Sequence, residues 1–140
     1  MDLNINLDTV EDIKDLPTGL YNAVIADVRF DKTKGGNGKD PSPYVRFGFR
    51  ATEALESQDL EGVELNRMVY STDQFLTKKA LPIFKKRMND AGLTPSGDLR
   101  EWAESLVGSD VRIVVGFETR KKADGTEIQN LRVTSFKKAA

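Results

Sequence analysis

The chain has 140 residues, of which 39% are hydrophobic and 31% charged, and its formal net charge is −1. These values are typical of one globular domain. The chain contains neither cysteine nor histidine, which excludes disulfides, thiol nucleophiles, the usual zinc sites and the commonest general base. We therefore expect neither an enzyme nor a cofactor. No apolar run is long enough to cross a bilayer and no secretory signal is visible, so we expect a cytoplasmic protein.

Charged residues are segregated along the chain. Residues 1–19 carry five acids and the single Lys14, and residues 53–64 carry five acids and no base. The compensating bases lie in residues 29–50, 67–87 and 120–122. A polyanion responds to where charge lies rather than to the net value. The near-neutral total is therefore compatible with a nucleic-acid partner.

The first third of the chain predicts an arm, a strand and a loop. Residues 1–16 are acidic with weak alternation, and we interpret them as an N-terminal arm before one domain over residues 17–140. Residues 20–30 predict a first strand, and because both parities are apolar in its first half we expect a bulge midway. Residues 31–43 are rich in glycine, lysine and proline, which is typical of a hairpin loop.

Residues 44–52 alternate strictly between apolar and other side chains, which predicts a second strand with one buried face. The inward set is Val45, Phe47, Phe49 and Ala51. The outward set is Tyr44, Arg46, Gly48 and Arg50. A third strand is predicted over residues 63–71, where parity does not fix the register.

The helical region follows. Residues 71–74 offer capping side chains, and apolar residues at helical spacing follow as far as Gly92, which predicts a helix that Pro82 either kinks or restarts. Asp98 and Glu101 form a capping pair for a second short helix. Trp102 lies on its apolar face, which favours core packing over base stacking. The bases of residues 78–87 favour the wet side of an amphipathic helix.

Residues 111–117 and 127–136 predict the last two strands, joined by a basic turn over residues 120–125. Three strands, a helical connection and a closing hairpin match the mainly β, five-stranded OB barrel. That fold binds ligands on the outer face of its second and third strands and on the flanking loops. Here both loops, residues 32–39 and 120–122, are basic.

This placement gives a set of candidate nucleic-acid-binding residues. Outward tyrosines can stack on bases, arginines can meet phosphates, and Gly48 is expected to leave room for a base. The candidates are Arg29, Lys32, Lys34, Lys39, Tyr44, Arg46, Arg50, Arg67, Tyr70, Arg120, Lys121 and Lys122. The alternative interpretation is that these loops and Tyr44 are ordinary solvated surface.

Several segments resemble the small phage-encoded OB-fold single-stranded DNA-binding proteins. The segments are Pro17-Thr-Gly-Leu-Tyr21, Lys32-Thr-Lys-Gly35, the Phe47/Phe49 strand, Phe84 to Leu93 ending Asp-Ala-Gly-Leu, and Leu106-Val-Gly-Ser-Asp-Val111. The resemblance implies sequence-independent coating of single-stranded DNA during phage replication or recombination, in the cytoplasm of an infected bacterium. Replication or recombination proteins would be further partners, and a homo-oligomer or cooperative array would form on DNA.

One feature departs from that family. Its replicative members typically end in an acidic tail, whereas this chain ends Phe136-Lys-Lys-Ala-Ala140. We hypothesise that the acidic arm, Asp2 to Asp15, competes with DNA in its place. Two other functions stay open: an OB-like module that recruits replication or recombination proteins with little nucleic-acid affinity, and, less favoured, a magnesium nuclease using the acids of residues 53–64.

Overall fold

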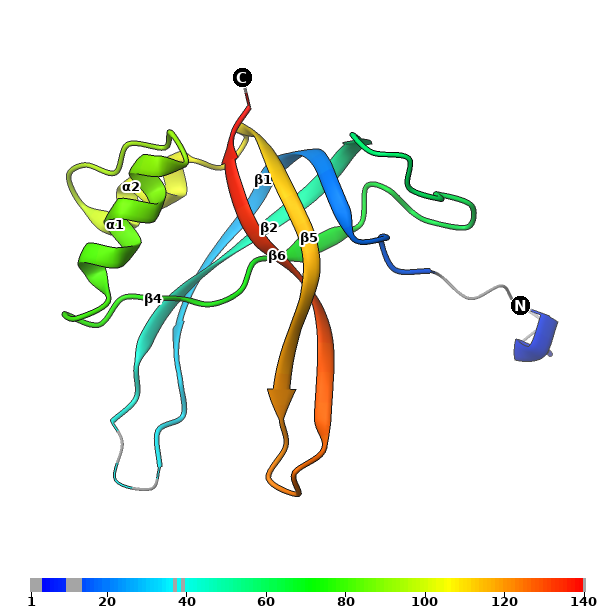
Figure 1. Ribbon diagram of the computed structural model, residues 1–140, viewed down its shortest axis with the longest axis horizontal. Coiled ribbons are helices and arrows are strands. Elements are labelled where there is room, and N and C mark those ends of the chain that lie inside the picture. Colours follow the sequence, from blue (N-terminus) through cyan, green and yellow to red (C-terminus); the bar gives the residue numbers. More distant parts are fainter. Residues whose placement is uncertain (1–3, 10–13, 37, 39, 140) are drawn as a thin grey trace.

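A computed structural model describes residues 4–9, 14–36, 38 and 40–139. The described chain is built around one strongly curled sheet, with two helices on one side (Figure 1). Two long hairpins project from the sheet in the same direction, and the C-terminal end lies at the opposite end of the sheet. The ends of the two hairpins therefore lie beyond the packed part of the molecule.

The sheet is mainly antiparallel. Its strands are β1 (Gly19–Lys32), β2 (Pro43–Ala54), β3 (Met68–Tyr70), β4 (Gln74–Phe75), β5 (Asp110–Lys121) and β6 (Glu127–Lys138). The spatial order is β3-β2-β1-β5-β6, and β4 pairs with β2 beyond the end of β3. An isolated parallel bridge joins Ser71 to Val133, with Thr72 N–H donating to the Val133 carbonyl at 3.2 Å. This bridge brings the two ends of the sheet together and gives it a barrel-like shape, as the sequence predicts.

β1 contains the irregularity that its two apolar parities predict. Its register against β2 shifts between Asn22 and Ala23 and again between Ile25 and Asp27. The first half buries Tyr21, Ala23 and Ile25, whereas Val28 and Phe30 pack partly buried beyond the second shift. The strand therefore turns a different parity toward the core along its length.

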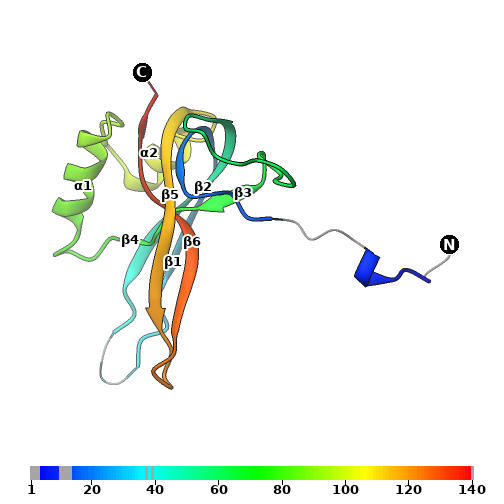
Figure 2. The same ribbon diagram turned by 45° about the vertical axis from the view of Figure 1, so that its right-hand side comes forward.

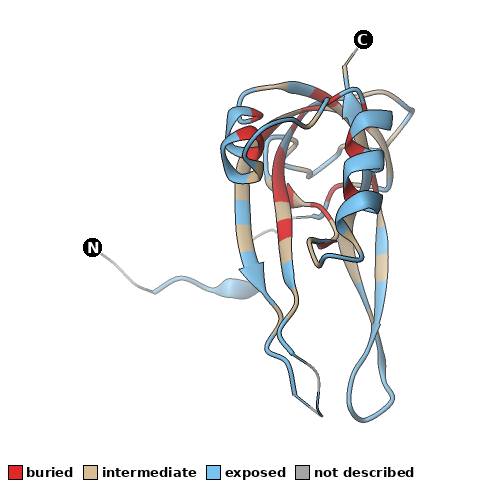
Figure 3. Cartoon of the chain, turned by 90° about the vertical axis from the view of Figure 1, so that its left-hand side faces the viewer, coloured by how far each residue is buried: buried red, intermediate tan, exposed pale blue. Residues whose placement is uncertain are grey.

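The core lies inside the curl and under the helices. Val45, Phe47, Phe49 and Ala51 of β2 are completely buried, as their alternation predicts. The ring of Phe136 packs against Phe47 and Phe49 with centroids 5.2 and 5.0 Å apart. Figure 3 shows that buried residues concentrate in the curl and on the inner side of the helices, whereas the hairpin ends are exposed. The ends of the hairpins consequently contribute little to the hydrophobic core.

The helices are α1 (Leu81–Asp90) and α2 (Leu99–Ser105), and a short 3-10 turn, η1, spans Leu7–Thr9. The Asp98 side chain caps α2 by accepting from Glu101 N–H at 3.0 Å, which confirms the predicted capping pair. Trp102 is buried, and its indole N–H donates to the Leu93 carbonyl at 3.1 Å. Its predicted place in the core is confirmed. None of the helices in the described ranges combines the length and apolarity that a bilayer crossing requires.

Three sequence-based boundaries are wrong. The helix predicted from residues 71–74 begins only at Leu81, with Pro82 in its first turn, because Gln74 and Phe75 pair with β2 instead. The third strand is limited to Met68–Tyr70. Arg120 and Lys121 are the last residues of β5 rather than part of a turn, which spans Lys122 to Thr126.

Candidate nucleic-acid interface

The outer face of β2 carries the residues that pleating turns away from the core. Tyr44 and Arg46 are half-buried and Arg50 is exposed. β1 brings Arg29 opposite Arg46, and β3 brings Tyr70 opposite Gly48. Five of the twelve candidate residues therefore share one face of three neighbouring strands. We call this set, Arg29, Tyr44, Arg46, Arg50 and Tyr70, the β2 face.

Aromatic rings and guanidiniums are paired on this face. The guanidinium of Arg29 lies over the ring of Tyr70, 5.7 Å from its centroid, and that of Arg46 lies 5.6 Å from the Tyr44 centroid. Cation–π contacts of this kind hold a charged group against a flat apolar one. The face thus offers two sites at which a base and a phosphate can be met by adjacent side chains.

A further aromatic residue, Phe75 of β4, belongs to the same surface. Its ring meets that of Tyr44 edge-on, with centroids 6.2 Å apart, and it is 44% exposed. Phe75 is absent from the candidates predicted from the sequence, because the pattern of residues 71–91 predicts a capped helix. Its position after two polar residues gives no signal of pairing with Tyr44, since that contact depends on β4 extending the sheet.

The space above Gly48 is filled, which corrects the expectation of room for a base. A side-chain carbon at this position would lie 3.0 Å from Met68 Sδ and 3.2 Å from Tyr70 Cε1. Glycine is therefore needed so that the Tyr70 ring can lie across β2. Any base would stack on the rings themselves.

Asp73, between β3 and β4, holds two arginines together. Its Oδ1 accepts from Arg46 Nε at 2.8 Å and lies 2.7 Å from Arg46 Nη2, while its Oδ2 lies 3.6 Å from Arg120 Nη2. Arg120 also donates from Nε to Glu118 at 3.2 Å. Asp73 is also absent from the predicted candidates, because its sequence position predicts a helix cap. The pairing brings the end of β5 to the β2 face and leaves Arg46 engaged by a carboxylate.

The other candidate cations surround this centre. Lys32 and Lys34 are exposed on the β1–β2 hairpin, and Lys121 and Lys122 are exposed on the β5–β6 hairpin. Lys39 lies outside the described residues. Both hairpins extend past the sheet, as Figure 2 shows, so they border the β2 face at one end.

Arg50 and Arg67 lie toward the other end of β3. Arg50 Nη1 donates to the Asn66 carbonyl at 3.0 Å, and Arg67 lies 3.7 Å from Asp15. Arg67 is thus coupled to the last acid of the predicted arm rather than to the Asp73 cluster. Arg50, at one end of the β2 face, and Arg67 beyond it therefore lie apart from the ion-pair cluster of Asp73, Arg46 and Arg120.

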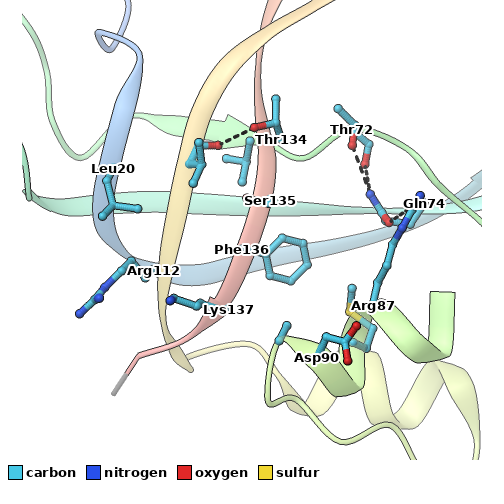
Figure 4. A pocket seen from close by; sticks show the side chains of 14 residues that line it. Leu20, Thr72, Gln74, Arg87, Asp90, Arg112, Thr134, Ser135, Phe136 and Lys137 are labelled. Atoms are coloured by element: carbon cyan, nitrogen blue, oxygen red, sulfur yellow. Dashed lines mark hydrogen bonds between the residues drawn. The ribbon is translucent and has the colours of Figure 1, made fainter. Parts of the chain in front are cut away.

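A groove of about 680 Å³ lies elsewhere, beside β6 and α1. Figure 4 shows Arg112 and Lys137 at one side of it and Arg87, which donates to Gln74 at 3.3 Å, at the other. None of its lining residues belongs to the predicted site. Among the described residues, no three acids converge as metal ligands, in the 53–64 turn or elsewhere.

No protein-family model matches the chain, and no curated protein matches it significantly in sequence.

Proposed function

We propose that this protein binds single-stranded DNA without sequence preference and coats it during phage DNA replication or recombination, in the cytoplasm of the infected bacterium. The observation that carries the proposal is the β2 face, where Tyr44 and Tyr70 each lie against an arginine guanidinium. Stacking contributes roughly 1–3 kcal/mol per base and requires no particular base. Adjacent guanidiniums supply the phosphate contacts.

We further propose that the barrel-like sheet is an OB fold. Three features support this. β1 pairs with both β2 and β5, the helices connect the third-strand region to β5, and the Ser71–Val133 bridge is parallel. The OB fold uses the face of its second and third strands and the loops at one end as its ligand surface. In an OB fold, the β2 face and the two basic hairpins would correspond to this ligand surface.

The test is fluorescence anisotropy of labelled oligo-dT with the full chain at two salt concentrations. We expect binding whose log-log salt dependence has a slope near −0.7 per phosphate neutralised. Matched RNA and duplex competitors measure the preference for single-stranded DNA. If no binding is detected even in dilute buffer, the proposal is wrong.

Substitutions locate the binding surface. Arg29→Ala and Arg50→Ala each remove an exposed cation of the β2 face, and we expect each to weaken all oligonucleotides about fivefold, which corresponds to roughly 1 kcal/mol. Lys138→Ala is the matched control, because it removes the same charge at the end of β6 away from the hairpins. An equal loss in all three variants would show that charge alone, and not this face, governs binding.

The engagement of Arg46 and Arg120 by Asp73 favours a second candidate function. Arginines already neutralised by a carboxylate fit a module that recruits replication or recombination proteins and has little nucleic-acid affinity. The same titration separates the two functions, since the module predicts no salt-sensitive complex with oligo-dT. Magnesium-dependent degradation of the oligonucleotide would instead revive the nuclease interpretation.

A further inference from the structure

An apolar groove of about 550 Å³ separates the start of α1 from the loop before α2. Phe84 and Trp102, packed edge to face with centroids 6.0 Å apart, form its buried floor. Leu81 and Leu99 line it as well, and Leu81 is 38% exposed. The residues that line this groove include none of the β2 face, so it is a separate surface.

The rim of this groove is positively charged. Lys78 and Lys85 line it beside the first turn of α1. That turn contains no acidic residue, and the N-cap residue, Ala80, supplies no side-chain hydrogen bond. The Leu81 N–H donates to the Thr77 carbonyl at 2.8 Å and Pro82 has no N–H, so the attraction for negative charge comes from the two lysines and the helix dipole. An apolar floor with this rim fits a short segment that carries both aliphatic and acidic side chains.

The chain itself contains such a segment at residues 4–9. Ile5 is 64% exposed and Leu7 is 79% exposed. Leu7 and Asp8 lie in a turn that Asn6 holds: its Oδ1 accepts from Asp8 N–H at 3.0 Å and its carbonyl from Thr9 N–H at 3.1 Å. A turn that is already formed loses less conformational entropy when it binds.

The segment and the groove lie on opposite sides of the molecule. Figures 1 and 2 show residues 4–9 extending away from the sheet on the side remote from α1 and α2. The chain is attached on that remote side, because Lys14 bridges to Val63 and Leu16 is buried in the core. This placement favours the groove of another molecule over the segment's own groove.

We propose that residues 4–9 of one copy dock in the α1–α2 groove of the next copy. Ile5 and Leu7 would cover the floor formed by Phe84 and Trp102, and Asp8 would face the lysine rim. Because the two contacting surfaces differ, the contact is heterologous and propagates head to tail. This contact leaves the β2 face uncovered and needs no nucleic acid. It can therefore be tested independently of the proposed function.

The test is sedimentation velocity of the full chain without DNA over a concentration series. We expect concentration-dependent growth into species larger than dimers. Leu7→Asp on the arm and Leu81→Asp in the groove are each expected to weaken association by at least about tenfold, since each places a charge on a buried apolar contact. Ile83→Asp is the matched control, because Ile83 is 54% exposed on α1 but does not line the groove.

Mixing the two variants gives the sharpest result. Leu7→Asp retains an intact groove and Leu81→Asp retains an intact arm, so each alone is expected to be monomeric while their mixture forms a dimer that grows no further. A charge exchange supplies a second measurement. Lys85→Glu alone is expected to weaken association, and adding Asp8→Lys to the same chain is expected to restore it. Circular dichroism and thermal unfolding establish that each variant is folded.

Three results would overturn the proposal. They are a wild-type chain that is monomeric throughout the concentration series, association that Leu7→Asp leaves unchanged, and an equal loss in Ile83→Asp. Oligo-dT binding by a monomeric wild-type chain would remove the head-to-tail contact while leaving the proposed function intact. Association of the wild-type chain without any oligo-dT binding would support the head-to-tail contact and contradict the proposed function.

Discussion

Arg46 and Asp73 form the closest ion pair on the candidate interface, with Arg46 Nη2 2.7 Å from Asp73 Oδ1. Both side chains are largely shielded from solvent, and the second oxygen of Asp73 faces Arg120. A carboxylate between two guanidiniums occupies the kind of position that a phosphate would take. On the proposed function, single-stranded DNA would therefore have to displace Asp73 from these arginines or bind around the cluster.

Asp73→Asn is expected to tighten oligo-dT binding at low salt by about three- to tenfold, because it removes one negative charge and the ion pair that engages Arg46, while Arg120 keeps Glu118 as its partner. The salt dependence is also expected to become steeper. Anisotropy titrations at several salt concentrations measure both effects. Asp90→Asn is the control, since Asp90 is paired with Lys86 on α1. Unchanged or weaker binding by Asp73→Asn would mean that Asp73 only orients the arginines.

The aromatic pair on β2 and β4 gives a second prediction. We expect Tyr44→Ala and Phe75→Ala each to cost roughly 1–3 kcal/mol of oligo-dT binding, because each removes a stacking surface. Lys34→Ala in the first hairpin is expected to cost less. Affinities from titration at fixed salt compare the three variants. A larger loss for Lys34→Ala would show that the loops, rather than the rings, dominate.

Gly48→Ala separates binding from stability. The added methyl group would lie 3.1 Å from Asp27 Cβ as well as close to Tyr70, so we expect the Tyr70 ring to move and affinity to fall severalfold. Stability is expected to change by less than about 1 kcal/mol, because replacing a strand glycine offsets the overpacking. Urea unfolding and oligo-dT titration give the two readouts. Loss of stability with unchanged affinity contradicts the assigned role of Tyr70.

Tyr21 predicts a pH dependence of stability. Burial, with a smaller contribution from Glu56, raises the pKa of Tyr21 above its ordinary value of 10.0. Its hydroxyl donates to the Pro17 carbonyl at 2.6 Å. A raised pKa means that the protonated phenol stabilises the fold fully below about pH 10, and that this contribution is lost as pH rises further.

We therefore expect Tyr21→Phe to be about 1 kcal/mol less stable than wild type at neutral pH. Above pH 10 the difference is expected to shrink, because phenylalanine does not ionise. Urea unfolding of both proteins at pH 7, 9, 10 and 11 measures it. A difference that stays constant over this range argues against ionisation of Tyr21 as the cause.

The sequence predicts those elements whose side chains alternate about one buried face. β2 is the clearest case, since Phe47 and Phe49 are buried as their parity requires. The Asp98 cap is also predictable, because the capping residue and its partner are three residues apart. The alternation of side chains and the spacing of a cap and its partner are properties of a short segment. In β2 and at the start of α2, no tertiary contact overrides them.

The features that the sequence does not predict depend on distant contacts. Gln74 and Phe75 look like the start of a helix, but pairing with Val45 and Tyr44 makes them a strand. Asp73 looks like a cap, yet it binds Arg46 across the sheet. These roles arise when β4 joins the edge of β2, which no local propensity encodes.

The Ser71–Val133 bridge has a consequence for how the molecule is made. Ser71 is completely buried, its hydroxyl accepts from Phe47 N–H at 3.0 Å, and its strand partner lies beyond both helices in the chain. During synthesis the first four strands therefore leave the ribosome with their outer edges uncovered. Exposed strand edges favour aggregation, and closure across a long connection is slow. The formation of the β5–β6 hairpin thus determines when the nascent protein becomes protected from aggregation.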